Sequence, residues 1–282
     1  MDEMRRVVET MIRKAQETGN IVEGDYAGDD NLYYCGKCHT RKQTVVDLFG
    51  QQRIVPCICK CRADAIKAEE EARQRYELQQ KIMRMRGVAF PEEEMQEWNF
   101  ANDDKANPIL TTAMKRYVEN FSTLSKEGKG LLLFGDTGTG KSYLAACVVN
   151  ALIDKGVPSM MTNFKIIDRA MSESFEGRQR YFNTLVSHPL LVLDDLGAER
   201  KTEYMQDIVF DILDARSMSN KPIIVTTNLT REELMNPISM KEKRIFSRVF
   251  KLCTPIEVAG KDRRTEALRN GIGSMKSLLG LE

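Results

Sequence analysis

The sequence predicts an α/β protein whose three-layer core has helices on both faces of a parallel sheet. A small cysteine-rich module and a helical linker precede this core. From residue 131 onward, short apolar runs alternate with helix-length segments, which is typical of a parallel sheet flanked by helices. Five of the seven cysteines fall between residues 35 and 61. Between these regions, residues 62–86 contain neither Gly nor Pro, and their composition favours a long helix.

These features divide the chain into three parts. Residues 1–61 are expected to form a partner-binding N-terminal domain, residues 62–90 a helical linker and residues 91–282 the α/β core. In the first part, apolar residues recur at helical spacing over residues 2–18, which predicts an amphipathic helix.

The core elements follow in order along the chain. Asn107 followed by Pro108 is a favourable helix start. Thr230 opens a capping-box sequence, which predicts a further helix. The apolar runs that predict strands are 131–134, 159–162, 190–193 and 223–226. Small or polar residues follow each run, at the sheet edge where α/β proteins bind their ligands.

The composition excludes several classes of protein. Hydrophobic residues make up 42% and charged residues 29% of the 282 residues, which argues against collagen-like and wholly disordered chains. The net charge of +1 excludes a globally basic nucleic-acid binder, although a local basic groove remains compatible with it. No apolar run approaches the ~18 residues of a membrane span, and no signal-peptide pattern follows Met1. We therefore expect a cytoplasmic protein with no membrane partner.

A phosphate-binding loop follows the first apolar run. The pattern G-x-x-x-x-G-K-[ST] is matched in full, directly before a helical segment that begins near Tyr143. Its residues are Gly135, Asp136, Thr137, Gly138, Thr139, Gly140, Lys141 and Ser142. Glycines let backbone N–H groups close around phosphate oxygens, and the helix N-terminus adds partial positive charge. Lys141 would reach the β- and γ-phosphates of ATP, and the Ser142 hydroxyl would ligate Mg²⁺.

Polar side chains follow two later strands. Asp194 and Asp195 come directly after the run 190–193, where one acid would hold Mg²⁺ and the other would position water. Asn228 follows the run 223–226 and could orient water or contact the γ-phosphate. By itself this Asn is weak evidence, because Asn often begins a turn.

The cysteine cluster has metal-like spacing. Cys35 and Cys38 form a C-x-x-C knuckle, and the segments 43–49 and 52–55 flank Gly50 like the strands of a hairpin. After the hairpin, the candidate ligands are Cys57, Cys59 and Cys61, with His39 as a spare. Spacing alone does not choose among them. Metal-free thiols are less favoured because the cysteines are dense and symmetrically placed, and a redox motif is less favoured because no βαβ pattern surrounds the C-x-x-C. The cluster predicts a structural zinc ribbon.

The ordered motifs resemble those of the AAA+ ATPases, and more narrowly those of the DnaC/IstB-like group of helicase loaders and transposition helpers. The resemblance covers residues 88–268 and rests on five segments. These are GDTGTGKS at 135–142, LLVLDDLG at 190–197, IIVTTN at 223–228, KRIFSRV at 243–249 and GKDRR at 260–264.

The resemblance implies roles for individual residues. It places nucleotide contacts from Gly135 to Tyr143, Mg²⁺ at Ser142 and Asp194, and sensor 1 at Asn228. It also implies an arginine finger at Arg248 and sensor 2 at Arg264, with Arg263 as the alternative. Because many AAA+ proteins have Glu where this chain has Asp195, we expect slow, switch-like hydrolysis.

The same resemblance implies the remaining ligands. Loader-like chains of phage type end the ribbon in C-x-C, which selects Cys35, Cys38, Cys59 and Cys61 as zinc ligands. It places single-stranded DNA contacts at Phe175, Thr202 and Tyr204, although the two aromatic side chains could equally be core residues of amphipathic helices.

The function that the resemblance implies is replicative helicase loading. Such a protein would bind ATP, Mg²⁺ and Zn²⁺, bind single-stranded DNA and deliver a DnaB-type helicase during replication initiation. A finger acting on a neighbouring subunit implies self-association. The alternatives are an IstB-like transposition helper and a nucleotide-gated nucleic-acid-binding adaptor with little hydrolysis. A small-molecule kinase would leave Asn228 and Arg248 unexplained.

Overall fold

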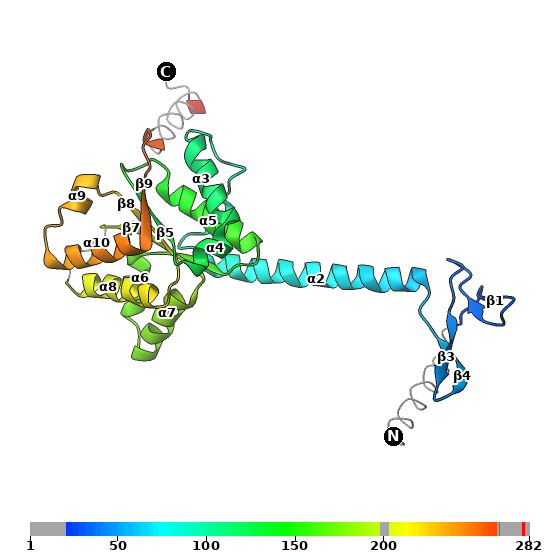
Figure 1. The fold of residues 1–282 in the computed structure, drawn as a ribbon. Coiled ribbons are helices and arrows are strands. Elements are labelled where there is room, and N and C mark those ends of the chain that lie inside the picture. Colours follow the sequence, from blue (N-terminus) through cyan, green and yellow to red (C-terminus); the bar gives the residue numbers. More distant parts are fainter. Residues whose placement is uncertain (1–20, 198–202, 264, 266–277, 280–282) are drawn as a thin grey trace. The chain divides into compact units, whose positions relative to one another are not determined.

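The computed structural model describes residues 21–197, 203–263, 265 and 278–279 (Figure 1). The predicted helix over residues 2–18, Thr202 and Arg264 lie outside the described residues. The chain divides into two compact units, Met1–Gln79 and Gln80–Glu282.

The first unit contains two small antiparallel sheets. Their strands are β1 (Tyr26–Ala27), β2 (Tyr33–Tyr34), β3 (Gln43–Leu48) and β4 (Gln51–Pro56). The predicted hairpin is confirmed as β3 and β4, in which Leu48 pairs with Gln51. The two loop residues, Phe49 and Gly50, both have positive φ (57° and 78°), as a tight hairpin turn that follows strand twist requires. At the open end of the hairpin, the Cys57 amide donates to the Lys42 carbonyl at 2.7 Å. This bond brings the second group of cysteines towards the first.

Helix α2 (Lys60–Ala89) is longer than the sequence predicts. The helix continues through Gly87 to Ala89, which is buried. The last turns are held in the second unit, where Lys81 Nζ donates to the Gly156 carbonyl at 3.3 Å and Arg86 forms an ion pair with Asp154. This packing outweighs the ~1 kcal/mol that a helical Gly costs relative to Ala.

The second unit is built on a five-stranded parallel sheet with the order β6-β7-β8-β5-β9. The strands are β5 (Gly130–Phe134), β6 (Ser159–Asn163), β7 (Leu190–Leu196), β8 (Ile223–Thr227) and β9 (Cys253–Glu257). The four predicted strands are confirmed. The fifth, β9, lies at the sheet edge and exposes Thr254, Pro255 and Glu257.

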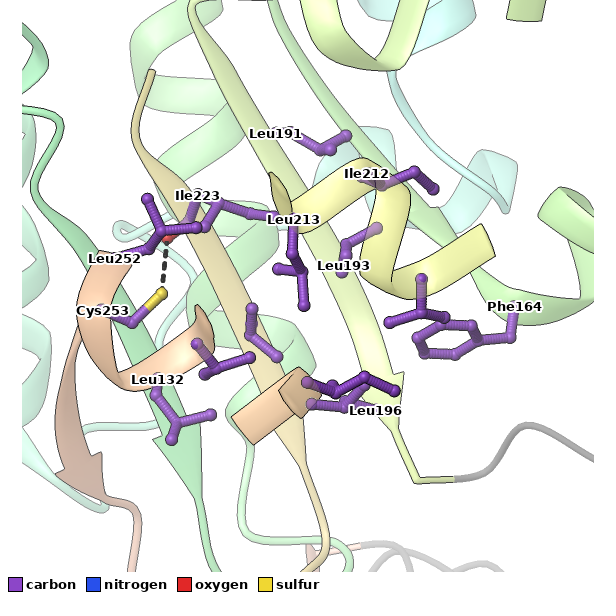
Figure 2. Packing of buried hydrophobic residues seen from close by; sticks show 14 of the residues in the cluster. Leu132, Phe164, Leu191, Leu193, Leu196, Ile212, Leu213, Ile223, Leu252 and Cys253 are labelled. Carbon is purple, nitrogen blue, oxygen red and sulfur yellow. Dashed lines mark hydrogen bonds between the residues drawn. The ribbon is translucent and has the colours of Figure 1, made fainter. Parts of the chain in front are cut away.

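Helices cover both faces of this sheet, so the predicted three-layer core is confirmed. They are α3 (Pro108–Glu119), α4 (Phe121–Lys126), α5 (Lys141–Asp154), α6 (Phe164–Met171), α7 (Phe175–Ser187), α8 (Glu203–Met218), α9 (Arg231–Met235) and α10 (Met240–Leu252), with the 3₁₀ helix η1 (Glu93–Glu97). Alternate strand residues face opposite layers. Leu191 and Leu193 pack with α8 and α10 (Figure 2), whereas Leu190 and Val192 pack with α3 and α5.

The predicted helix caps are present. Asn107 accepts a hydrogen bond from the Leu110 amide at 3.2 Å, and Thr230 forms a capping box with Glu233. Within the described residues, no helix has the length and apolarity needed to cross a membrane.

Candidate functional site

The phosphate-binding loop joins β5 to α5 and borders a cavity of about 300 Å³. Lys141 begins α5, and its Nζ donates to the carbonyls of Gly135 (2.9 Å) and Asp136 (2.6 Å). The cavity is lined by Trp98, Thr137, Gly138, Gly140, Lys141, Ser142, Tyr143, Asp194, Asp195, Thr226, Asn228 and Arg263. Gly135, Asp136 and Thr139 do not line it but shape the loop, and the Thr139 hydroxyl donates to the Asp136 carbonyl at 2.9 Å. The loop is therefore wrapped around the lysine side chain.

Gly138 is required by both conformation and space. Its φ of 79° lies in the left-handed region, and a Cβ here would lie 1.8 Å from Asp262 Oδ1. Arg263, which follows Asp262 in the sequence, donates its backbone N–H to the Gly138 carbonyl at 3.0 Å. The segment that the sequence marks as GKDRR therefore packs directly on the phosphate-binding loop.

Two strand ends place the acidic residues in the same cavity. Asp194 is 8% exposed, and its carboxylate accepts a hydrogen bond from the Thr226 hydroxyl at 2.6 Å. Burial raises the pKa of Asp194, and hydrogen bonds from Thr226 and Ser142 act in the opposite direction. Asn228 Nδ2 donates to Asp195 Oδ1 at 2.6 Å. The lysine, the serine, both aspartates and the asparagine therefore converge, as their motifs predict.

Mg²⁺ suits this set of donors. The Ser142 hydroxyl and the Asp194 carboxylate are oxygen ligands of the kind that Mg²⁺ prefers beside phosphates. The low exposure and raised pKa of Asp194 mark a carboxylate that a nearby cation would stabilise in its charged form.

Three cavity residues are not among the predicted site residues. The Trp98 ring lies 5.6 Å from the Tyr143 ring, and the Tyr143 hydroxyl donates to the Asn99 carbonyl at 2.8 Å. Arg263 lines the cavity and pairs with Asp104 at 3.2 Å, whereas the preferred Arg264 is not described. The third of these cavity residues is Thr226. Arg263 is named in the sequence analysis only as the alternative to Arg264 for sensor 2. No local signal marks Trp98, because its contact with the loop joins residues far apart in the sequence.

The predicted arginine finger lies away from the cavity on α10. Arg248 pairs with Asp214 at 2.7 Å, and its guanidinium carbon lies 5.8 Å from the centre of the Phe210 ring. Both partners belong to α8 of the same chain. Arg248 is about one-third exposed, which leaves it accessible to a neighbouring molecule.

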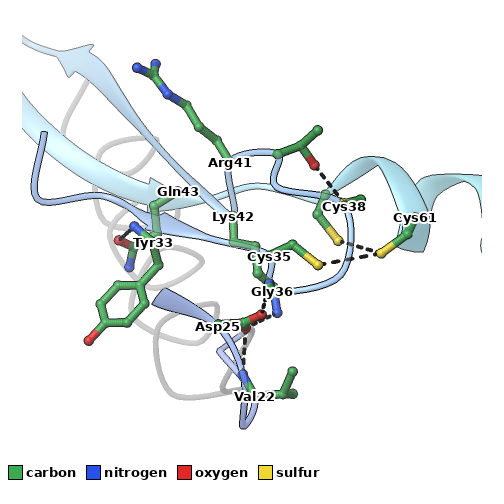
Figure 3. A network of polar contacts seen from close by, with 12 residues as sticks. Val22, Asp25, Tyr33, Cys35, Gly36, Cys38, Arg41, Lys42, Gln43 and Cys61 are labelled. Carbon is green, nitrogen blue, oxygen red and sulfur yellow. Dashed lines mark hydrogen bonds and ion pairs between the residues drawn. The ribbon is translucent and has the colours of Figure 1, made fainter. Parts of the chain in front are cut away.

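The cysteine cluster forms a second candidate site, in the first unit. The sulfur atoms of Cys35, Cys38, Cys59 and Cys61 all lie within 4.8 Å of one another. Cys61 Sγ lies 3.6 Å from Cys35 Sγ and 3.5 Å from Cys59 Sγ, and Figure 3 shows the labelled thiols pointing towards one another. A tetrahedral ion with metal–sulfur bonds of ~2.3 Å sets its sulfur atoms ~3.8 Å apart, so the four sulfurs fit zinc closely.

The electrostatics of the cluster also suit a cation. Hydrogen bonding, chiefly from the Thr40 hydroxyl, lowers the pKa of Cys38 to about 5. Cys59, Cys38 and Cys35 together raise the pKa of Cys61 to about 12. Four neighbouring thiols cannot all be deprotonated without a positive charge among them, and a divalent metal supplies it.

A nearly buried ion pair supports the cluster (Figure 3). Lys42 Nζ lies 2.5 Å from Asp25 Oδ2, and the two side chains are 7% and 2% exposed. Asp25 Oδ1 also accepts the Gly36 amide at 3.1 Å, inside the C-x-x-C loop. The hydrogen bond to Lys42 lowers the pKa of Asp25 to about 2. The pair thus ties the knuckle to the strand that leads into the hairpin.

The predicted DNA-contact aromatics lie on the surface of the second unit. Phe175 begins α7 and is 73% exposed, and Tyr204 lies in the first turn of α8 and is 54% exposed. The interpretation of these two residues as core aromatics is therefore wrong. The Arg178 guanidinium lies 5.9 Å from the centre of the Phe175 ring, which places a cation beside an exposed aromatic face.

Comparisons with known proteins agree with this geometry. The replicative helicase loader DnaI of Bacillus subtilis (strain 168) is 26% identical over 220 residues, which cover 74% of this chain and 67% of DnaI. The replicative helicase loader DnaC of Escherichia coli (strain K12) is 31% identical over 126 residues. These residues cover 43% of this chain and about half (49%) of DnaC.

Solved structures extend the similarity to the fold. The crystal structure of DnaI matches with a TM-score of 0.53 and 28% identity, covering 64% of this chain and 99% of that one. The crystal structure of the DnaC helicase loader matches with a TM-score of 0.52 and 25% identity, covering 60% and 100%. The sequence model of the family of IstB-like ATP binding proteins matches residues 59–269, well over half of the chain. The chain therefore belongs to the family of IstB-like ATP binding proteins.

Proposed function

We propose that this protein is an ATP-dependent replicative helicase loader, which binds single-stranded DNA and delivers a DnaB-type helicase to DNA during replication initiation. The observation that carries the ATPase part is the convergence of Lys141, Asp194, Asp195 and Asn228 on one cavity. The loader part is supported by the relatives, which are named replicative helicase loaders.

Each of these residues has a separate role in the nucleotide site. Lys141 and the backbone N–H groups of the loop hold the phosphates of ATP. Ser142 and Asp194 hold Mg²⁺, which when bound neutralises charge on the phosphate oxygens. Asp195 positions the attacking water, and Asn228 holds the Asp195 carboxylate in place at 2.6 Å. Because Asp195 is one methylene shorter than Glu, hydrolysis is slow.

Completion of the site by a neighbouring subunit accounts for Arg248. Its guanidinium pairs with Asp214 in its own chain, so reaching a neighbour's γ-phosphate requires exchange of that partner. A finger supplied in this way stabilises transition-state charge and couples hydrolysis to self-association. Arg264 acts as sensor 2, with Arg263, which lines the cavity, as the alternative.

The N-terminal unit binds the helicase. Zinc held by Cys35, Cys38, Cys59 and Cys61 stabilises a small module that has no room for substrate at the metal, so its role is structural. The adjoining helix α2 is largely exposed and offers further contact surface.

Single-stranded DNA binds at Phe175, Thr202 and Tyr204. An exposed aromatic ring next to an arginine is the usual combination for stacking a base and neutralising its phosphate.

Stacking on an aromatic residue is worth ~1–3 kcal/mol per base, so Phe175→Ala should weaken binding of an oligonucleotide at least about 5-fold. Fluorescence anisotropy measures this, and Tyr76→Ala, which removes a similarly exposed ring (62%) from α2, should leave it unchanged. Equal affinities for Phe175→Ala and the unmodified protein would remove Phe175 from the DNA site.

ATP hydrolysis by the purified protein, with and without single-stranded DNA, tests the proposed function beside capture of a replicative helicase. We expect DNA-stimulated turnover and helicase capture. Lys141→Ala should lower turnover at least ~100-fold, because the β- and γ-phosphates lose their only loop cation. Trp98 is the one tryptophan in the chain and lines the cavity, so its fluorescence reports nucleotide binding directly.

Other outcomes identify the alternatives. Turnover with capture of a transposase instead of a helicase would indicate a transposition helper. Nucleotide binding without turnover, with every activity unaffected by Lys141→Ala, would indicate an adaptor and would overturn the ATPase proposal.

A further inference from the structure

The end of strand β7 is irregular at the two acidic residues. The register between β7 and β8 shifts between Leu193 and Leu196, so the regular ladder of the sheet is interrupted there. Within this interruption Asp195 has a φ of 64°, in the left-handed region that non-glycine residues rarely adopt. Such a conformation costs ~1–3 kcal/mol and persists only where the surroundings hold it in place.

The Thr226 side chain of β8 provides the connection. Its hydroxyl donates to Asp194 Oδ1 at 2.6 Å and accepts the backbone N–H of Asp195 at 2.9 Å. A threonine hydroxyl has one hydrogen to donate and lone pairs to accept, so both bonds can exist at once. The next residue, Thr227, donates its hydroxyl to the Leu196 carbonyl at 2.6 Å. Two threonine hydroxyls of β8 thus bond the backbone of β7 where the register shifts.

Packing alone gives no reason for a hydroxyl at this position. Thr226 is 1% exposed and follows Ile223, Ile224 and Val225 in a strand that is buried throughout. Valine has nearly the same shape and suits a buried strand at least as well. What the hydroxyl adds at this position is its two bonds, both of which end on the acidic pair.

We infer that Thr226 is a positioning residue for ATP hydrolysis, whose hydroxyl fixes the Asp194 carboxylate for Mg²⁺ and holds the Asp195 backbone so that its carboxylate faces Asn228 and the cavity. This inference rests on the proposed ATPase function. By donating to Oδ1, Thr226 sets the rotation of the Asp194 carboxylate.

The first test is Thr226→Val, which removes the hydroxyl and keeps the shape. Loss of a group that orients a metal-binding residue typically costs ~10–100-fold in metal affinity or activity, so we expect kcat to fall at least about 10-fold. The concentration of Mg²⁺ that half-saturates the Trp98 fluorescence response to ADP should rise by a similar factor, and this readout needs no turnover. ADP binding without Mg²⁺ should stay within about 2-fold, because loop contacts to the phosphates are intact.

Matched variants separate positioning from folding. Thr162→Val removes a fully buried strand hydroxyl that bonds Tyr181 at 2.8 Å, outside the cavity, and should leave kcat and the Mg²⁺ midpoint unchanged. Thr226→Ser keeps the hydroxyl and should retain most of the activity, whereas Thr226→Ala, of nearly the same size, should lose it. The Ser and Ala pair keeps the test decisive if the valine variant does not fold.

The inference would be overturned by unchanged kcat and Mg²⁺ midpoint in folded Thr226→Val, or by equal loss in the Ser and Ala variants. Failure of the proposed function is a different result. In that case the unmodified protein shows no hydrolysis that Lys141→Ala removes, whatever residue 226 is.

Discussion

One zinc ion per chain should be found in the reduced protein, and removing it should unfold the cysteine-containing part of the N-terminal unit while the nucleotide site keeps its function. Structural zinc sites contribute ~10–16 kcal/mol of apparent binding free energy at neutral pH, which becomes folding free energy where little else holds the fold. Among the described residues of this unit, the buried apolar residues are Leu32, Cys35 and Cys59. Two of these three are candidate ligands. Isolated two-stranded hairpins are marginal in water, so the unit depends on the metal.

Serine substitutions of single cysteines test this zinc assignment. Cys59→Ser should lower the bound zinc, measured by mass spectrometry of the metal, and should make residues 21–59 sensitive to proteolysis. Cys57→Ser is the matched control, because Cys57 lies two residues away and its thiol donates to the Arg41 carbonyl at 3.4 Å, outside the cluster. Both variants should still give the Trp98 response to nucleotide, because the cavity belongs to the other unit. Metal-free reduced protein, or equal zinc loss in both variants, would contradict the assignment.

Local patterns explain why most of the core could be predicted. Buried parallel strands have continuous apolar sequences, and the run at 190–193 forms the first four residues of β7, all of them buried. The phosphate-binding loop is likewise a local motif, with its backbone conformation set by its own glycines. Strand β9 has no such run, because an edge strand that exposes Thr254 and Glu257 lacks the apolar continuity of a central strand.

Features that depend on long-range contacts could not be predicted. The choice of Cys59 and Cys61 over Cys57 was set by resemblance, and their spacing gave no reason for it. In the folded chain it follows from the hairpin, which turns Cys57 towards Arg41. Trp98 and Arg263 reach the cavity from opposite ends of the second unit's sequence. In the sequence, Thr226 is an ordinary strand threonine, and its role depends on contacts with β7 that only the fold provides.

The second large effect is expected at Arg216, which is fully buried in the second unit. Its guanidinium, at the end of α8, donates to backbone carbonyls from two separate stretches of chain. These belong to Leu185, Val186, His188, Pro189 and Pro222. The bonds tie the connection between α7 and β7 to the residue that precedes β8. Burial lowers the pKa of Arg216 to about 10, so the side chain remains charged at neutral pH. A sequence pattern cannot reveal this role, since a helical arginine usually lies at the surface.

Arg216→Met should destabilise the second unit by about 3–5 kcal/mol, because methionine fills part of the space but leaves buried carbonyls without donors. Denaturant unfolding followed by Trp98 fluorescence measures the change, and the midpoint should fall with little change in slope. Arg116→Met, on the exposed side of α3, should stay within about 0.5 kcal/mol of the unmodified protein. The carbonyls lie where β7 and β8 begin, whereas Asp194 and Asn228 lie where these strands end. Folded Arg216→Met should therefore bind nucleotide normally, and a stability within 1 kcal/mol of the unmodified protein would show that the carbonyls find other donors.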